Sequence, residues 1–171
     1  MKAPPMNVRL ATEDDAARIY EMFDEVIAEG ESYDFENDPG RERMRELWFP
    51  SYGKTYVAEE NGEVIGAAVV RKNTMVNDPS ICNAIFIVAK SARKRGVGAA
   101  LGEFAVDEGR RLGYREMRFN LVVSTNTSAV RLWERLGFEI IETLPGAFPH
   151  PRLGPVDAFV MRRSLESSRN G

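Results

Sequence analysis

Residues that bind metals or form covalent cross-links are scarce in this chain. Its 171 residues include one cysteine, Cys82, and one histidine, His150. One cysteine cannot form an internal disulfide bond, and one cysteine with one histidine falls short of the four ligands that a structural zinc site uses. We therefore expect no metal site, and a Ser-His-Asp triad would have to use His150.

Long hydrophobic runs are also missing. No apolar run approaches the roughly 18 residues that a membrane-spanning helix needs, and the first ten residues, MKAPPMNVRL, lack the apolar centre of a signal peptide. Hydrophobic residues nevertheless make up 43% of the chain, which is too many for a disordered protein. We expect a globular, cytoplasmic protein without a membrane partner, with one domain over residues 1–165 and a disordered polar tail over 166–171.

The formal net charge of −3 conceals an uneven distribution of charge. Residues 1–89 hold 9 basic and 17 acidic side chains, whereas residues 90–118 hold 8 basic and 4 acidic ones. A surface that coats nucleic acid would be basic overall, so we expect no nucleic-acid partner. The basic segment suits one anion site, and the eleven acidic residues within 13–38 suit a cationic second ligand.

Apolar periodicity and turn residues predict seven strands and four helices. The strands are expected at residues 7–11, 55–59, 64–71, 81–88, 116–123, 139–143 and 157–163; the helices run from Thr12 to about Ala28, briefly from Asp38-Pro39, and over 97–112 and 126–136. The segment 145–155 is rich in proline and glycine and is predicted as a loop. Hairpin-linked strands together with strand-helix-strand units predict the α/β (α+β) class with a mixed sheet.

The clearest chemical signal lies between the strand at 81–88 and the helix that follows it. The connection reads Arg93-Lys94-Arg95-Gly96-Val97-Gly98. A helix N-terminus presents unpaired amides and a partial positive charge, and glycine lets an anion approach the backbone. A pyrophosphate group would fit such a cradle, although a solvated basic turn would have the same sequence. Gly98 is followed by Ala99-Ala100-Leu101, which excludes a P-loop and a dinucleotide fingerprint.

A second motif follows, in which Asn126 is placed to cap the helix at 126–136. Its apolar residues recur at helical spacing and are expected to pack in the core: Ala129, Leu132, Trp133 and Leu136.

Together the two motifs resemble those of the GNAT superfamily of acyl-CoA-dependent N-acetyltransferases. In that family Arg/Gln-x-x-Gly-x-Gly/Ala opens a helix after a strand, and Arg93, Gly96 and Gly98 match it. The family's later stretch Asn-x-x-Ala-x-x-Leu-Tyr-x-x-x-Gly-Phe is matched by Asn126, Ala129, Leu132, Gly137 and Phe138. Residues 31–39, ESYDFENDP, look most like the phosphinothricin-acetyltransferase-like branch.

The resemblance implies a mixed, mostly antiparallel central sheet of about seven strands flanked by about four helices. It also implies acetyl-CoA as co-substrate, without a metal. The residues expected to bind it are Phe86, Ile87 and Val88 along the pantetheine arm, Arg93, Lys94, Arg95, Gly96, Val97, Gly98 and Ala99 around the pyrophosphate, and Asn126 and Trp133 near the thiol end.

Two positions depart from the family pattern. Trp133 stands where the family usually has a tyrosine that protonates the leaving thiolate, and an indole N–H cannot serve as that acid. Many relatives carry a glutamate early on the strand before the phosphate loop, where this chain has Cys82 and Asn83. Cys82 lies in an apolar strand and is expected to be a core residue.

The reaction implied is direct attack of a neutral amine on the thioester, so a base must first remove a proton from the ammonium form. Glu31 and His150 are our candidate bases, because a carboxylate accepts protons and an imidazole exchanges them near neutral pH. Further candidates are Glu29, Tyr33, Asp34 and Asp157.

The expected function is N-acetylation of a primary amine, with a small-molecule acceptor as the partner. Two alternatives stay open: acetylation of a protein N-terminus or lysine, which favours an open groove over a closed pocket, and a regulatory module that binds acyl-CoA without turnover. The late strands offer a surface for a homodimer.

Overall fold

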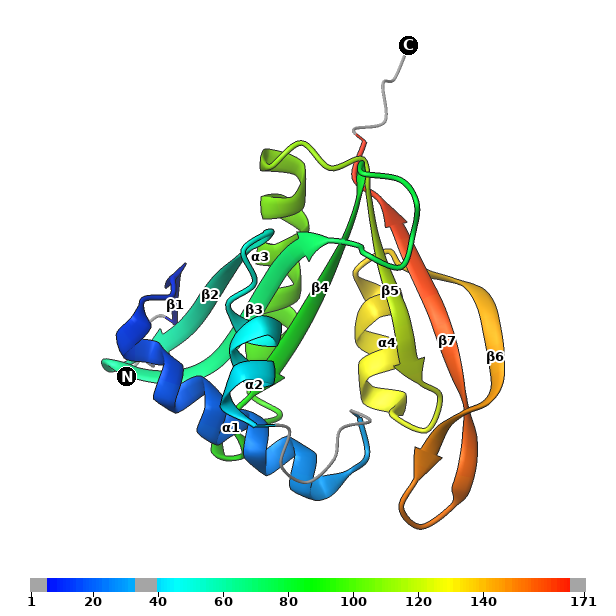
Figure 1. Ribbon diagram of the computed structural model, residues 1–171, viewed down its shortest axis with the longest axis horizontal. Helices are drawn as coiled ribbons and strands as arrows, with labels where there is room; N and C mark the ends of the chain where they lie inside the picture. The colour runs from blue at the N-terminus through cyan, green and yellow to red at the C-terminus, as the bar shows by residue number, and fades with distance from the viewer. Residues whose placement is uncertain (1–5, 33–39, 167–171) are drawn as a thin grey trace.

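A computed structural model describes residues 6–32 and 40–166 of the chain. The expected helix start at Asp38-Pro39, the base candidates Tyr33 and Asp34, and most of the expected tail lie outside the described residues. The described chain forms one sheet of seven strands in the order β1-β2-β3-β4-β5-β7-β6 (Figure 1). The strands are β1 (Asn7–Leu10), β2 (Gly53–Glu60), β3 (Glu63–Lys72), β4 (Ile81–Val88), β5 (Glu116–Val123), β6 (Glu139–His150) and β7 (Gly154–Ser164).

Neighbouring strands in this sheet are antiparallel, apart from the parallel pair β4 and β5. The hairpin of β2 and β3 turns at Asn61-Gly62, which both have positive φ, as a tight hairpin turn requires. The α/β (α+β) class and the mostly antiparallel sheet are thus confirmed.

Helices cover both faces of the sheet. They are α1 (Ala16–Glu29), α2 (Arg41–Trp48), α3 (Val97–Arg111) and α4 (Thr127–Arg135), with 3₁₀ turns η1 (Glu13–Asp15) and η2 (Lys90–Ala92). Figure 1 shows α1 and α2 in front of β3 and β4, with α3 behind them. None of the described helices is long and apolar enough to cross a membrane.

The first helix starts in two steps rather than at Thr12. The three acidic residues after Thr12 form η1, and α1 begins only at Ala16. Asp15 is held at this junction, because its carboxylate accepts hydrogen bonds from the Thr12 amide at 2.7 Å and from Arg9 Nη1 at 2.8 Å. The helix then ends at Gly30, whose φ of 68° is left-handed, as expected for a glycine after a helix.

The prediction of a loop over 145–155 is wrong. The two terminal strands extend through this segment as a long hairpin, in which Pro149 pairs with Pro155 and His150 with Gly154. The register shifts between Leu144 and Phe148, which accommodates the irregular backbone there. Because β6 is the outer strand of the sheet, a proline can sit in it without removing a hydrogen bond to a further strand.

Candidate active site

The site begins where β4 and β5 separate. These strands pair only at Ile81↔Glu116 and Cys82↔Met117, although each has eight residues. Beyond these pairs they diverge, which Figure 1 shows as a widening gap between their ribbons. We call this divergence the β4–β5 split. It places the end of β4, residues 86–88, beside α3 and α4 rather than beside another parallel strand.

The phosphate-loop candidate, residues 93–98, lies at the wide end of the split. Lys94 has φ of 62° and Gly96 has φ of 81°, so left-handed residues alternate in the loop just before α3. Such alternation directs successive amides into one anion-binding concavity. The first helical bond of α3 runs from the Ala100 amide to the Gly96 carbonyl at 3.1 Å, so the helix itself satisfies none of the amides of Val97, Gly98 and Ala99.

Neither glycine of this loop is tightly packed. A Cβ at Gly96 would meet nothing within 4 Å, and a Cβ at Gly98 would make only ordinary contacts with Leu132 and Val88 at 3.6 and 3.9 Å. The loop therefore has both the donors and the room that a pyrophosphate needs.

Two arginines of the loop are held by carboxylates. Arg93 Nη1 lies 3.0 Å from Glu29 Oε1 at the end of α1, and Arg95 Nη2 lies 2.7 Å from Glu60 Oε1 at the end of β2. These pairs join the loop to both flanking elements. An incoming phosphate would have to compete with the carboxylates for both guanidinium groups.

Four aromatic rings fill the split on the side of α4. Trp133 lies 4.8 Å from Phe86 and 4.7 Å from Phe119, measured between ring centroids, and Phe119 stacks on Phe138 at 4.5 Å. Trp133 also packs over Gly102 of α3, where a Cβ would lie 3.0 Å from the indole. Trp133 is therefore a buried packing residue at the position where the resemblance implies that the family usually has a tyrosine.

Asn126 caps α4, as the sequence predicted. Its side-chain oxygen accepts a hydrogen bond from the Ala129 amide at 3.4 Å and one from Ser128 Oγ at 3.2 Å. The helix cap thus uses the side-chain Oδ1 of Asn126.

The base candidates Glu31 and His150 come from distant segments that meet in space. Glu31 Oε1 pairs with Arg152 Nη2 at 2.5 Å, and a Cβ at Gly30 would touch the Pro151 ring at 3.5 Å. The end of α1 therefore packs against the tip of the β6–β7 hairpin. The same end of α1 also contacts the candidate phosphate loop, because Glu29 pairs with Arg93.

His150 is buried rather than displayed on a loop, with 8% of its surface exposed. Its Nδ1 accepts hydrogen bonds from the amides of Arg152 and Leu153, each at 3.1 Å. The imidazole thus holds the hairpin turn, and its Nδ1 lone pair is in use in this conformation.

The remaining candidates have structural partners. Asp157 Oδ1 accepts from the Gly146 amide at 3.0 Å across the hairpin. Cys82 is fully buried, and burial raises the pKa of its thiol to about 12, so it is an inert core residue, as predicted. Among the described residues no three His, Cys, Asp or Glu side chains gather as a metal site would require.

Asn73 belongs to no motif of the sequence, yet it is fully buried next to the β4–β5 split. It lies in the connection between two hairpin strands, where an asparagine is a routine turn residue. A pattern along the chain cannot show that its side chain reaches β5.

Comparisons with known proteins agree on one family. Residues 17–138 match the model of the acetyltransferase (GNAT) family. A solved GCN5-related N-acetyltransferase from Kribbella flavida is 40% identical, with a TM-score of 0.88 over 93% of this chain and 97% of that one. A GNAT superfamily phosphinothricin acetyltransferase from Sinorhizobium meliloti, solved in complex with AcCoA, is 26% identical, with a TM-score of 0.80 over 94% and 88% of the two chains.

A curated relative is N-acetyltransferase aca1 from Schizosaccharomyces pombe. It is 37% identical over 107 residues, which cover 61% of this chain and 50% of that protein. The chain thus spans about half the length of this relative.

Proposed function

This chain belongs to the acetyltransferase (GNAT) family, and we propose that it transfers the acetyl group of acetyl-CoA to a primary amine of a small molecule. The observation that carries the proposal is the loop at 93–98, with its left-handed Lys94 and Gly96, at the wide end of the β4–β5 split. The resemblance inferred from the two motifs is confirmed by the family match.

Different residues of this chain would bind different parts of acetyl-CoA. The amides of Val97, Gly98 and Ala99 and the side chains of Arg93, Lys94 and Arg95 would hold the pyrophosphate, because they combine unpaired N–H donors with positive charge. The backbone of Phe86, Ile87 and Val88 would run beside the pantetheine arm. Asn126 and Trp133 would lie near the thiol end, with Trp133 as a packing surface.

Acetyl-CoA would supply an activated acetyl group, which a neutral amine would attack directly at the thioester carbonyl. The C–N bond would form as the C–S bond breaks, coenzyme A would leave as its thiolate, the nitrogen would lose one proton and the thiolate would take one up from water. The protein has to remove a proton from the ammonium form beforehand. We propose Glu31 and His150 for this step. Glu31 offers a half-exposed carboxylate, whereas His150 would first have to release two backbone amides from Nδ1.

A small-molecule acceptor is favoured by the contact between the end of α1 and the hairpin tip. Gly30 packs on Pro151, and Glu31 pairs with Arg152, so the end of α1 and the hairpin tip are in contact at this place. An extended peptide would need an open groove at this place.

The experiment is an acetyl-CoA-dependent thiol-release assay with a panel of small amines, lysine peptides and peptide N-termini, next to calorimetric binding of acetyl-CoA. We expect binding, with thiol release for at least one small amine. Preferred turnover of peptides would favour a protein acceptor. Binding without release for any amine would identify a regulatory module. Absence of binding would refute the proposal as a whole.

Two matched variants test the bases. His150→Asn keeps a side-chain oxygen near the place of Nδ1, so the turn can persist while proton exchange is lost. Glu31→Gln keeps the shape of the side chain and removes its charge. If a residue is the base, its variant should have wild-type thermal stability, a lower kcat and an altered dependence of kcat on pH. An unchanged dependence of kcat on pH would exclude that residue as the base.

A further inference from the structure

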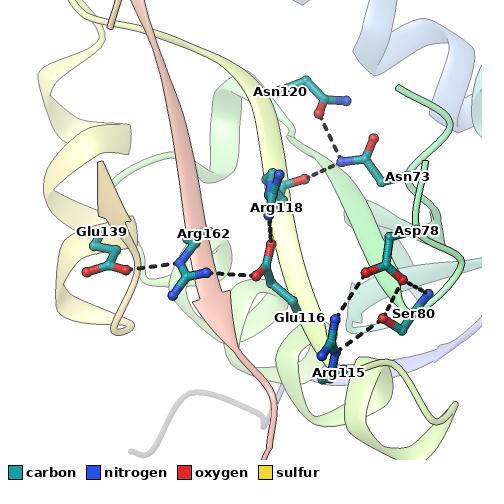
Figure 2. Close-up of polar contacts among 9 residues, drawn as sticks. All are labelled: Asn73, Asp78, Ser80, Arg115, Glu116, Arg118, Asn120, Glu139 and Arg162. Atoms are coloured by element: carbon teal, nitrogen blue, oxygen red, sulfur yellow. Dashed lines mark hydrogen bonds and ion pairs between the residues drawn. The ribbon is translucent and has the colours of Figure 1, made fainter. Parts of the chain in front are cut away.

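The β4–β5 split has a defined narrow end. The two strands stop pairing after Cys82↔Met117, so the next carbonyl of β5, that of Arg118, loses its strand partner. Asn73 takes over this role: its Nδ2 donates to the Arg118 carbonyl at 3.0 Å. The same Nδ2 donates to Asn120 Oδ1 at 2.9 Å (Figure 2).

Asn73 is held firmly in its own place. Its side chain is fully buried, its Oδ1 accepts from the Met75 amide at 3.1 Å, and its backbone amide donates to the Ile81 carbonyl at 2.9 Å. Both side-chain N–H groups and the side-chain oxygen thus have partners. A buried amide with all its partners in place is rigid, because losing one partner leaves a polar group unsatisfied.

Part of the stretch of β5 that Asn73 contacts lacks pairing with a neighbouring strand. Along β5 the register with β7 shifts between Phe119 and Val122, so within the described strands Asn120 and Leu121 pair with neither neighbour. The side chain of Arg118 is held by Glu116 at 2.6 Å, and Glu116 also accepts from Arg162 of β7 at 3.1 Å. Figure 2 shows these ion pairs on β5 and β7, with Asn73 reaching β5 from the other side.

The connection that carries Asn73 has a second anchor, which is separate from the split. Asp78 accepts from Arg115 Nη2 at 3.0 Å and from Ser80 Oγ at 2.6 Å. Arg115 precedes β5, and its side chain is about half exposed. This anchor attaches the same segment to the same strand without touching the residues beyond Met117.

We propose that Asn73 is a positioning residue for acetyl transfer: by holding the Arg118 carbonyl and the Asn120 side chain, it fixes β5 at the narrow end of the split. The proposal rests on the proposed function, because Phe119, which lies between Arg118 and Asn120, packs on Trp133, and Trp133 is proposed to lie near the thiol end of acetyl-CoA. The candidate phosphate loop follows the far end of β4, so Asn73 makes no contact with the proposed phosphate end. Small displacements of reacting groups cost large factors in rate.

The test compares Asn73→Asp with Arg115→Gln. Asn73→Asp keeps the size of the side chain and loses both N–H donors, so the Arg118 carbonyl loses its partner and the Asn120 amide has to turn over to donate. Arg115→Gln loosens the second anchor of the same segment. The measurements are the Kd of coenzyme A by calorimetry, kcat with acetyl-CoA and the amine that gives most thiol release, and amide hydrogen exchange over residues 118–122.

For Asn73→Asp we expect kcat to fall by about 10- to 100-fold, with the Kd of coenzyme A within about threefold of wild type and faster exchange over 118–122. For Arg115→Gln we expect all three quantities to stay within about twofold of wild type. A general loss of folding would weaken coenzyme A binding as well, so the separation of kcat from Kd distinguishes positioning from stability.

Unchanged kcat and exchange in Asn73→Asp would overturn the inference, as would an equal loss in Arg115→Gln. If Asn73→Asp does not fold, Asn120→Ala can replace it, because this variant removes one of the two contacts that Asn73 Nδ2 makes with β5. Faster amide exchange over 118–122 with a lower kcat would then support the inference. No change in either quantity would overturn it. A wild-type protein that binds no acetyl-CoA refutes the proposed function instead, while the exchange measurement still reports on Asn73.

Discussion

Replacing Gly98 by glutamate is expected to abolish coenzyme A binding while the fold stays at least as stable. Gly98 is the second residue of α3, and a Cβ there makes only ordinary contacts at 3.6 and 3.9 Å. A carboxylate in the first turn of a helix stabilises it by about 0.3–1 kcal/mol, and removal of a helical glycine adds up to about 1 kcal/mol. The melting temperature should therefore stay constant or rise by a few degrees.

The effect on binding has the opposite sign. The new carboxylate would occupy the place proposed for the pyrophosphate and compete for the same amides. Two unit charges about 5 Å apart repel by roughly 3 kcal/mol at an effective dielectric constant of 20, which corresponds to a loss of more than about 100-fold in affinity. Steric exclusion from the cradle adds to this loss.

The assay is calorimetric titration with coenzyme A, together with a thermal melt of each variant. Gly98→Gln separates charge from size, because it has the same shape without the charge, and Gly98→Ala tests the added Cβ alone. Only the glutamate variant should regain affinity as salt rises from about 0.1 to 1 M, where the screening length falls from about 10 to 3 Å. Wild-type affinity in Gly98→Glu would refute the placement of the pyrophosphate at this helix end.

Three further predictions follow from the contacts described. Glu29→Gln should tighten coenzyme A binding about two- to fivefold in calorimetry, because Arg93 no longer pairs with a carboxylate. Hydrogen bonds from Arg111 and Tyr56 lower the pKa of the Glu108 carboxyl to about 2. The charged carboxylate therefore stabilises the fold above about pH 4.5, and this stabilisation is lost as the pH falls toward 2. Glu108→Gln should flatten the dependence of the free energy of unfolding on pH between these values. Trp133→Ala should lower the free energy of unfolding in urea by about 3–5 kcal/mol, because it empties the centre of the aromatic cluster.

Matched controls exist for all three. Glu103→Gln removes an exposed acid of α3 and should alter neither coenzyme A affinity nor the acid unfolding curve. Met75→Ala changes a side chain that is 79% exposed and should cost less than about 0.5 kcal/mol. Weaker binding of coenzyme A by Glu29→Gln would contradict the first prediction. An unchanged dependence of the free energy of unfolding on acidic pH in Glu108→Gln would contradict the second. A loss of less than about 1 kcal/mol of unfolding free energy in Trp133→Ala would contradict the third.

Local features of this protein were readable from its sequence. The strands at 81–88 and 116–123 have the predicted bounds, and Asn126 caps α4. The loop over 93–98 was recognisable as a candidate anion site because glycine and helix-start signals act over a few neighbouring residues. Burial of Cys82 followed from its apolar strand. Each of these features has a recognisable pattern of residue types within one short segment.

Only the tertiary structure decided which distant segments meet. Proline and glycine over 145–155 indicated a loop, whereas pairing with the opposite strand extends the hairpin and buries His150. Partners such as Glu29 for Arg93, Arg152 for Glu31 and β5 for Asn73 lie far apart in the chain. A residue type shows which bonds a side chain can make, but the partner it finds depends on how the whole chain packs. The sequence alone therefore determined the family and predicted an anion site, and the fold determined which segments contact the end of α1 and which residues support the β4–β5 split.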